Sequence, residues 1–409
     1  MRPACLLLLA AAACDGTIDM KVPPVEPKAP TRIEGALLAG APAARAELGM
    51  TEAGQQLGLL GGALAVAGTE TLYRFDRETS TFSAVPVGDV GESMATGPVR
   101  HLARRGPGLF VVAEAGIFHD ASGRLLRSPL SQSISAADIR ALDDFGEGAD
   151  EELWLVTATG AERVRGGVMT HVGLDHDGPV AADLAVAVEK NKGLVVAGSN
   201  LYSVDLVAKT ASWEAKGLPP VSAVARGDDG TVFLATRQGL YARAKSGGVS
   251  LYTFAPAGAE AVAVADVTTA FGETLVVAGG AVATLGGSTF GTLTAAKARG
   301  LTRDSNGDTF ALDGTSLVRL ATGRVVSFDA DVKPFMVAHC TSCHTTGANY
   351  SPRFDLTDFT VVSESTFLAK IIQRLTANGK PPMPPSDVEV LTSSDYAVVL
   401  RWVAGGKQP

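Results

Sequence analysis

The chain has 409 residues, which at about 150 residues per domain suggests two or three domains. Hydrophobic residues make up 46% and charged residues 19% of the sequence, a composition that excludes a disordered chain. The formal net charge is −8, and nothing in this balance indicates nucleic acid as a partner. The cysteine count is even, which is compatible with two disulfides, but the positions argue for separate roles: Cys5, Cys14, Cys340 and Cys343.

Residues 1–13 are typical of an export signal. One positive charge precedes a run of apolar residues that is too short to cross a bilayer, because a spanning helix needs about 20 residues. The run ends in Ala-Ala-Ala before Cys14. This resembles a bacterial lipobox, although Leu usually stands where Ala11 does. The resemblance implies a signal peptide over 1–13 and a lipid on Cys14; ordinary cleavage after an Ala-x-Ala pattern is the alternative.

Residues 14–35 are expected to form a linker. Four prolines lie between positions 23 and 30, with charged residues among them. This composition predicts a semi-extended, solvated spacer that holds the folded part off a membrane surface. We therefore expect an exported, lipid-anchored protein of the bacterial cell envelope, on the periplasmic side.

The region 36–327 contains a repeat. Runs of four apolar or small residues, each followed by a turn and a second short apolar segment, begin at positions 64, 109, 153, 194, 232, 275 and 309. A mean spacing of about 41 residues is typical of a β-propeller with one four-stranded blade per repeat. Seven repeats predict seven blades, give or take one, because residues 33–60 can supply a closing strand. An ordinary β-sandwich is the alternative.

No catalytic residue is predicted in the propeller, although residues 231–242 resemble repeats of regulator and lyase-like propellers, a resemblance that carries no reaction. The segment 304–308 (Asp-Ser-Asn-Gly-Asp) lacks the Gly and Glu positions of an EF-hand and predicts a turn between strands. Quinoprotein dehydrogenase propellers carry a Trp in nearly every blade, whereas only Trp154 and Trp213 lie here. The histidines have no metal-ligand spacing: His101, His119, His171 and His176.

The segment 340–344 reads Cys-Thr-Ser-Cys-His. Cys-x-x-Cys-His is the attachment signature of c-type haem, because two thiols must add to the vinyl groups on one porphyrin edge while the adjacent His reaches the iron. A redox disulfide and half of a zinc site are the alternatives. Zinc needs two more ligands, and no Cys or His follows His344. A thioredoxin-like site would require a surrounding βαβ pattern, which is missing.

A second ligand for the iron is expected from the Pro-rich segment 379–385 (Gly-Lys-Pro-Pro-Met-Pro-Pro). It contains Met383, which lies 39 residues after His344 and is the only Met beyond the motif. Prolines on both sides fix the loop, so that the thioether can be held towards an iron without a helix. Lys370 and Lys380 are weaker alternative ligands.

Three helices are expected around this motif. The patterns predict helices over 329–339, with Asp331 as N-cap, over 361–375, and over 395–404, with Ser394 as N-cap. With the motif and the Met-Pro-Pro loop, residues 328–409 resemble a class I monohaem cytochrome c domain. The resemblance implies a small all-α domain with one covalent haem c on Cys340 and Cys343, and with His344 and Met383 as axial ligands.

The expected fold class is therefore multidomain: an all-β, seven-bladed propeller followed by a small all-α cytochrome c domain. Two axial ligands would leave no open iron position, and the Met383 thioether would raise the reduction potential of the haem. We therefore expect an electron carrier rather than an enzyme. Its propeller is expected to dock a redox partner protein or a ligand. One alternative is a propeller-based dehydrogenase that passes electrons from a small substrate to the haem. Another is an interaction scaffold whose haem domain is dispensable.

Overall fold

The protein was analysed as a computed structural model of the full chain. It describes residues 16–21, 27–34, 46–50, 53–88, 96–105, 108–121, 124–132, 134–145, 152–157, 160–165, 168–175, 182–227, 229–254, 262–285, 289–292, 298–313, 316–321, 324–344, 355–376, 382–385, 391 and 395–409. The expected signal peptide, Cys14, His176, Lys380 and Ser394 lie outside the described residues.

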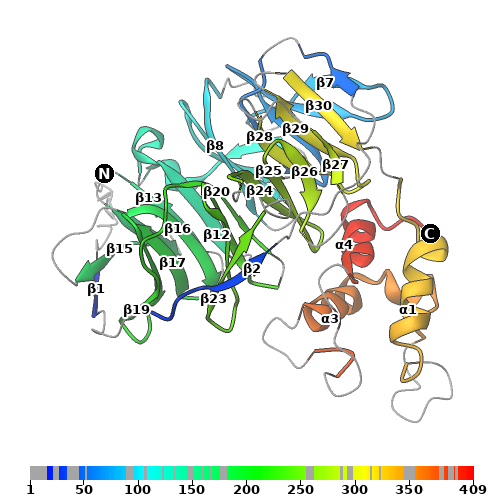
Figure 1. Cartoon of the computed structure of the whole chain (residues 1–409). Helices are drawn as coiled ribbons and strands as arrows, with labels where there is room; N and C mark the ends of the chain where they lie inside the picture. The colour runs from blue at the N-terminus through cyan, green and yellow to red at the C-terminus, as the bar shows by residue number, and fades with distance from the viewer. Residues whose placement is uncertain are drawn as a thin grey trace, which may run out of the picture.

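Seven four-stranded antiparallel sheets form the blades of a β-propeller (Figure 1). Blades 1 to 3 contain β4 (Gln56–Leu60), β5 (Ala63–Ala67), β6 (Leu72–Asp76) and β7 (Thr81–Ala84); β8 (Val99–Arg105), β9 (Gly108–Ala113), β10 (Gly116–Ala121) and β11 (Arg124–Arg127); β12 (Ala141–Phe145), β13 (Glu152–Val156), β14 (Ala161–Arg165) and β15 (Val168–Asp175). Two short 3-10 helices, η1 (Pro129–Gln132) and η2 (Ala136–Asp138), separate blades 2 and 3.

The remaining blades continue the order. Blades 4 to 6 contain β16 (Ala182–Glu189), β17 (Lys192–Ala197), β18 (Asn200–Asp205) and β19 (Thr210–Ala215); β20 (Val221–Arg226), β21 (Val232–Thr236), β22 (Gly239–Arg243) and β23 (Val249–Thr253); β24 (Val264–Ala270), β25 (Glu273–Ala278), β26 (Ala281–Thr284) and β27 (Thr289–Thr292). Blade 7 contains β28 (Ala298–Arg303), β29 (Thr309–Asp313), β30 (Ser316–Ala321) and the N-terminal strand β3 (Ala46–Leu48).

The repeated apolar run is the second strand of every blade. Each of the seven runs falls within β5, β9, β13, β17, β21, β25 or β29, and no hydrophobic side chain in these runs is more than 8% exposed. Both faces of these strands are covered by neighbouring blades, which explains continuous apolar runs instead of alternation. The prediction of a seven-bladed propeller is confirmed, and the β-sandwich alternative is wrong.

The N-terminal segment is built into the outer edges of the blades. β3 pairs with β30 and completes blade 7, as expected of a closing strand, and so joins the two ends of the ring. β1 (Gly16–Lys21) runs parallel to β15 and touches β19, which joins blades 3 and 4 in one nine-stranded sheet. β2 (Thr31–Glu34) adds a parallel fifth strand to blade 5. The described parts of the expected linker are thus extended, but they are hydrogen-bonded to the propeller.

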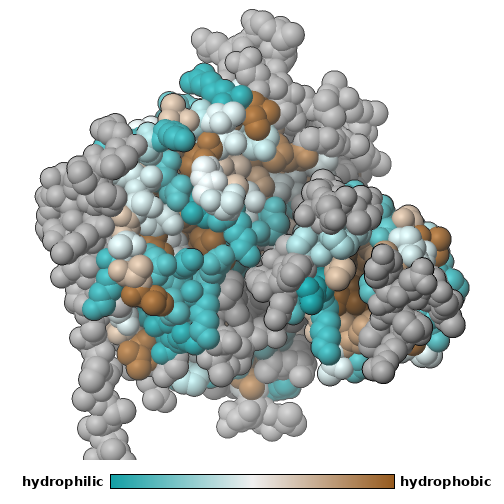
Figure 2. All heavy atoms as spheres, turned by 90° about the horizontal axis from the view of Figure 1, so that it is seen from below, coloured by the Kyte–Doolittle hydropathy of each residue, from teal (hydrophilic) through white to brown (hydrophobic). Residues whose placement is uncertain are grey.

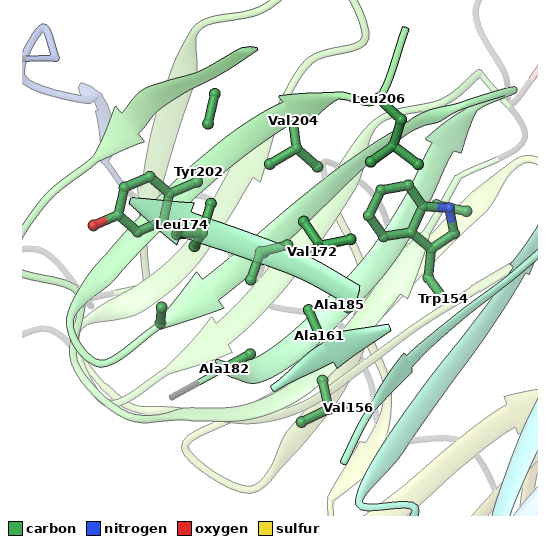
Figure 3. Close-up of a cluster of buried hydrophobic side chains, with 14 residues drawn as sticks. Trp154, Val156, Ala161, Val172, Leu174, Ala182, Ala185, Tyr202, Val204 and Leu206 are labelled. Carbon is green, nitrogen blue, oxygen red and sulfur yellow. The ribbon is translucent and has the colours of Figure 1, made fainter. Parts of the chain in front are cut away.

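The core between blades 3 and 4 shows how closely the blades pack (Figure 3). Trp154 of β13 is fully buried, and its indole Nε1 donates to Glu152 Oε1 at 3.1 Å. A Cβ on Gly193 of β17 would lie 2.6 Å from the Trp154 ring. Only glycine therefore fits opposite this tryptophan, and the two residues fix the distance between the two blades.

Helices follow the propeller and form a second, smaller core, here called the helical module. It consists of η4 (Phe328–Val332), α1 (Lys333–His339), α2 (Phe359–Val362), α3 (Ser365–Leu375) and α4 (Ala397–Ala404). The rings of Phe328, Phe359 and Trp402 contact one another in edge-to-face and tilted arrangements, at centroid distances of 5.6–6.2 Å. No helix among the described residues has both the length and the apolar character that crossing a membrane requires.

The helix ends differ in detail from the predicted ones. Ser327, not Asp331, caps the first helical segment: its hydroxyl accepts the Ala330 N–H, while the Asp331 carboxylate accepts the Ser327 N–H at 3.0 Å. This reciprocal arrangement is close to a capping box, which explains why the sequence suggested the wrong partner of the pair. The predicted helix 361–375 is divided into α2 and α3, because Glu364 caps a new start at Ser365.

Candidate functional site

The motif Cys340 to His344 forms a single turn at the C-terminal end of α1. The N–H groups of Cys343 and His344 both donate to the Cys340 carbonyl oxygen, at 3.1 and 3.0 Å. The Cys340 N–H in turn donates to Met336 O at 2.9 Å, so the turn continues directly from the helix. The backbone of Cys340 to His344 therefore makes one turn, which carries the two cysteines and the histidine of the motif.

Neither cysteine of the motif forms a disulfide, and both are half-buried. Cys340 packs against the apolar cluster of the helical module, whose members include Phe335, Met336 and Leu375. Val337, three residues before Cys340 and hence on the same helix face, is 53% exposed. Figure 2 shows hydrophobic residues at the surface of the helical module.

Met383 lies in the Pro-rich loop beyond α3. Met383 is 38% exposed, which is a high exposed fraction for a methionine. Its N–H donates to the Arg374 carbonyl oxygen at 3.2 Å, one of the carbonyl groups that a helix leaves unpaired at its C-terminus. This bond ties the loop to the end of α3, next to Leu375 of the same apolar cluster. The Met383 backbone is thus fixed at the end of α3, while Cys340, from a separate segment, packs against the apolar cluster.

The start of the helical module is held by charge. Both guanidinium Nη atoms of Arg324 bind the carboxylate of Asp331, and this contact lowers the pKa of the Asp331 carboxyl. Asp331 is only 8% exposed, whereas Arg324 is 69% exposed. The ion pair and the Ser327 cap together fix η4, which leads into α1 and the cysteine turn.

The propeller uses its polar residues to hold blades together. The Asp143 carboxylate of blade 3 lies 3.2 Å from the Arg226 guanidinium of blade 5, and both bind the Ala187 backbone of blade 4. His101 of blade 2 reaches the Ile139 carbonyl at 3.1 Å, and its burial lowers its pKa. Burial raises the pKa of Asp266, on the first strand of blade 6, to about 7. Within the described ranges, no three His, Cys, Asp or Glu side chains gather in a way that could hold a metal ion.

Sequence reasoning missed one residue that the structure makes prominent. Arg401 of α4 donates to carbonyl oxygens of the loop 304–308, almost a hundred residues earlier. The loop was predicted as a turn between strands, and it is one, between β28 and β29. A contact between a helix and a distant turn has no period in the sequence, so no pattern pointed to it.

The sequence matches no protein-family model, and no curated protein matches it. Solved structures with similar folds include the extracellular domain of a hybrid two-component system from B. thetaiotaomicron (15% identity, TM-score 0.49, 70% of this chain and 42% of that one). They also include a streptogramin B lyase (10%, 0.49, 68% and 97%) and an inactive virginiamycin B lyase from Staphylococcus aureus (10%, 0.48, 68% and 98%). At such similarity we draw no conclusion about function. The chain itself is a seven-bladed β-propeller with helices at its C-terminal end.

Proposed function

We propose that this protein is an exported, membrane-tethered c-type cytochrome that carries single electrons. The observation that carries the proposal is the turn from Cys340 to His344, in which two cysteines without a disulfide and a histidine follow one another at the end of α1. Their order and spacing are those of haem attachment. The helical module would then be a cytochrome c domain, and the propeller would dock a partner protein or a ligand.

The donor set fits a haem. Cys340 and Cys343 would form the thioether bonds, and His344 and Met383 would be the axial ligands. When bound, the haem would supply a one-electron redox couple. Ligation by the Met383 sulfur would favour its ferrous state. The chain's own part is to hold the ligands: α1 positions the turn, and the Met383 N–H bond to Arg374 anchors the loop. The exposed Val337 and Met383 would be covered by the group.

The arrangement of the helical module favours a carrier over a propeller-based dehydrogenase. In the described part of the chain, α4 contacts the propeller through Leu400, Arg401 and Ala404. Val337 and Met383 remain exposed. The propeller therefore does not cover these two residues, which would contact the haem and are here called the candidate haem face. In Figure 1, α4 lies nearest the blades, whereas α1 and α3 extend away from them. Electrons would therefore be exchanged with a separate redox partner protein, which approaches the exposed face.

The membrane tether is proposed on Cys14, as a lipidated first residue. Replacement by serine, Cys14→Ser, removes the thiol that would carry the lipid. We expect the variant to be recovered in the soluble periplasmic fraction, with unchanged haem content, whereas the parent protein remains with the membranes. A variant that stays membrane-bound would contradict lipid anchoring and leave the haem proposal intact.

A redox titration distinguishes the carrier from its alternatives. The full-length protein is expressed with a haem-attachment system, purified and titrated by absorbance. We expect a single one-electron wave, and no reduction by small organic substrates in the absence of a protein partner. Reduction by a small substrate would favour the dehydrogenase instead, and the absence of any haem absorbance would contradict both.

A further inference from the structure

Helix α4 belongs to two cores at once. On one side, Val399 and Trp402 are fully buried in the apolar cluster of the helical module. On another side, Leu400 and Ala404 pack against a propeller cluster that includes Leu59 of blade 1. Arg401 lies between these apolar faces. Helix α4 therefore contacts both the helical module and the propeller. Contacts that fix α4 on the propeller also fix the position of the helical module.

The receiving surface is the loop Asp304–Asp308 between β28 and β29. The loop is tied internally, since the Gly307 N–H donates to Asp304 O at 2.9 Å and the Asp308 N–H donates to Asp304 Oδ1 at 2.9 Å. The Ser305 N–H also donates to Gly62 O, in the β4–β5 turn of blade 1, at 2.9 Å. These bonds leave the carbonyl oxygens of Ser305 and Asn306 free to face α4.

The Arg401 guanidinium binds to this loop through its carbonyl oxygens. Its Nη2 donates to Asn306 O at 2.8 Å and to Arg324 O at 3.0 Å, and its Nε donates to Ser305 O at 3.4 Å. Gly307 has a φ of +84°, and a Cβ there would lie 2.5 Å from Arg401 Nη2. The loop thus offers two carbonyl acceptors to the guanidinium, Arg324 offers a third, and the loop has no room for a side chain beside it.

Charge accompanies these hydrogen bonds. Burial and the nearby guanidinium groups of Arg303 and Arg324 lower the pKa of Arg401, while the carboxylates of Glu273 and Asp304 act in the opposite direction. Burial and the nearby Asp308 raise the pKa of Asp304 to about 6. Asp308 itself is fully buried and ion-paired with Arg77 at 3.1 Å. A partly desolvated guanidinium needs such partners, because an unpaired buried charge is costly.

We propose that Arg401 and the loop 304–308 form a lock that fixes the helical module on blades 7 and 1, so that the turn 340–344 keeps one direction relative to the propeller. Arg401 is thus a positioning residue for the candidate electron-transfer site. Only this last role rests on the proposed function. The lock itself involves no haem and can be tested on the chain alone.

Hydrogen–deuterium exchange of the full-length protein, read by mass spectrometry, tests the lock. Arg401→Gln removes the charge and most of the donors, and we expect exchange of peptides covering α4 and 304–308 to rise about tenfold or more. Peptides from blades 3 and 4 should not change. Arg401→Lys keeps the charge but lacks the planar fork of donors, so its exchange should lie between that of the parent and that of Arg401→Gln.

A matched glycine pair tests the lock from the propeller side. Gly307→Ala places a Cβ against the guanidinium, whereas Gly247→Ala introduces the same strain at φ +93° with no atom within 4 Å. We expect only Gly307→Ala to speed exchange in α4. Unchanged α4 exchange in both Arg401→Gln and Gly307→Ala, or equal effects of the two alanine variants, would overturn the proposal. The same spectra show whether haem is attached, so failure of the haem proposal is seen separately.

Discussion

The seven blades and the helical module leave apolar surface in different places. In the propeller, the second strand of every blade is buried, and exposed apolar residues such as Val168 and Val207 are scattered singly, as on most proteins. In the helical module, the exposed Val337 stands one turn from Cys340, and the exposed Met383 lies in a loop tied to α3. On the proposed function, a haem would cover Val337 and Met383, whereas the apolar second strands of the propeller are already covered by neighbouring blades.

The largest effect is expected from replacing the proposed axial ligand Met383 in the helical module. Met383→Ala should abolish the ferric iron–sulfur absorption band of the haem-loaded protein and lower its potential, because the thioether stabilises the ferrous state. Met169→Ala, a partly buried methionine packed in the propeller, should leave the spectrum unchanged. An unaltered band in Met383→Ala would remove Met383 from the site and return attention to Lys370 or Lys380.

The largest stability effect is expected in the propeller. Trp154→Ala should lower the free energy of unfolding by about 3–5 kcal/mol, since a fully buried tryptophan is replaced by a cavity. Chemical denaturation followed by circular dichroism measures it. Trp213→Ala, at a partly buried position, should cost clearly less. Equal costs for the two substitutions would contradict the packing described between blades 3 and 4.

A smaller effect should appear as pH falls. The pKa of Asp266 is about 7 in the folded protein, above its ordinary value, so the folded state binds a proton that the unfolded state lacks. This contribution to stability grows as pH falls from 7 and is lost as pH rises through 7, by at most about 1.36 kcal/mol per pH unit. Unfolding curves of Asp266→Asn between pH 5 and 8 should lack this slope. An identical pH dependence in parent and variant would contradict it.

The helical module should respond to acid in the opposite direction. Hydrogen bonds from Thr360 and Thr366 lower the pKa values of Asp358 and Glu364, whose carboxylates cap α2 and α3. Their stabilisation is present above the ordinary carboxyl range and is lost as pH falls through the lowered pKa values. Helix signals should therefore weaken in acid before the strand signals do, to a small extent because both groups are exposed. If helix and strand signals are lost at the same pH, the helical module and the propeller do not respond to acid separately.

The sequence predicted the parts whose signal is local and repeated. All seven apolar runs lie on second strands, because burial on both faces leaves a continuous hydrophobic run at each repeat. The Cys340–His344 turn was predictable for the same reason, since its residues are adjacent. The three helical regions were found with their correct C-terminal ends, but their starts were wrong and the break between α2 and α3 was missed.

The parts that escaped prediction depend on distant partners. Proline-rich composition suggested a free spacer, yet β1 and β2 pair with strands more than a hundred residues away. The position of Arg401 gave no hint of the loop 304–308. The chemical assignment of Met383 rests on its order in the chain, and the structure adds the exposure of its side chain and the bond to Arg374.

Covalent haem attachment can be measured by the intact mass of the full-length protein, expressed with a haem-attachment system and denatured before measurement. We expect a mass increased by one haem that survives denaturation, and no increase in the variant with both Cys340→Ser and Cys343→Ser. An unmodified mass of the parent chain, or haem retained by the double variant, would contradict covalent attachment at this turn.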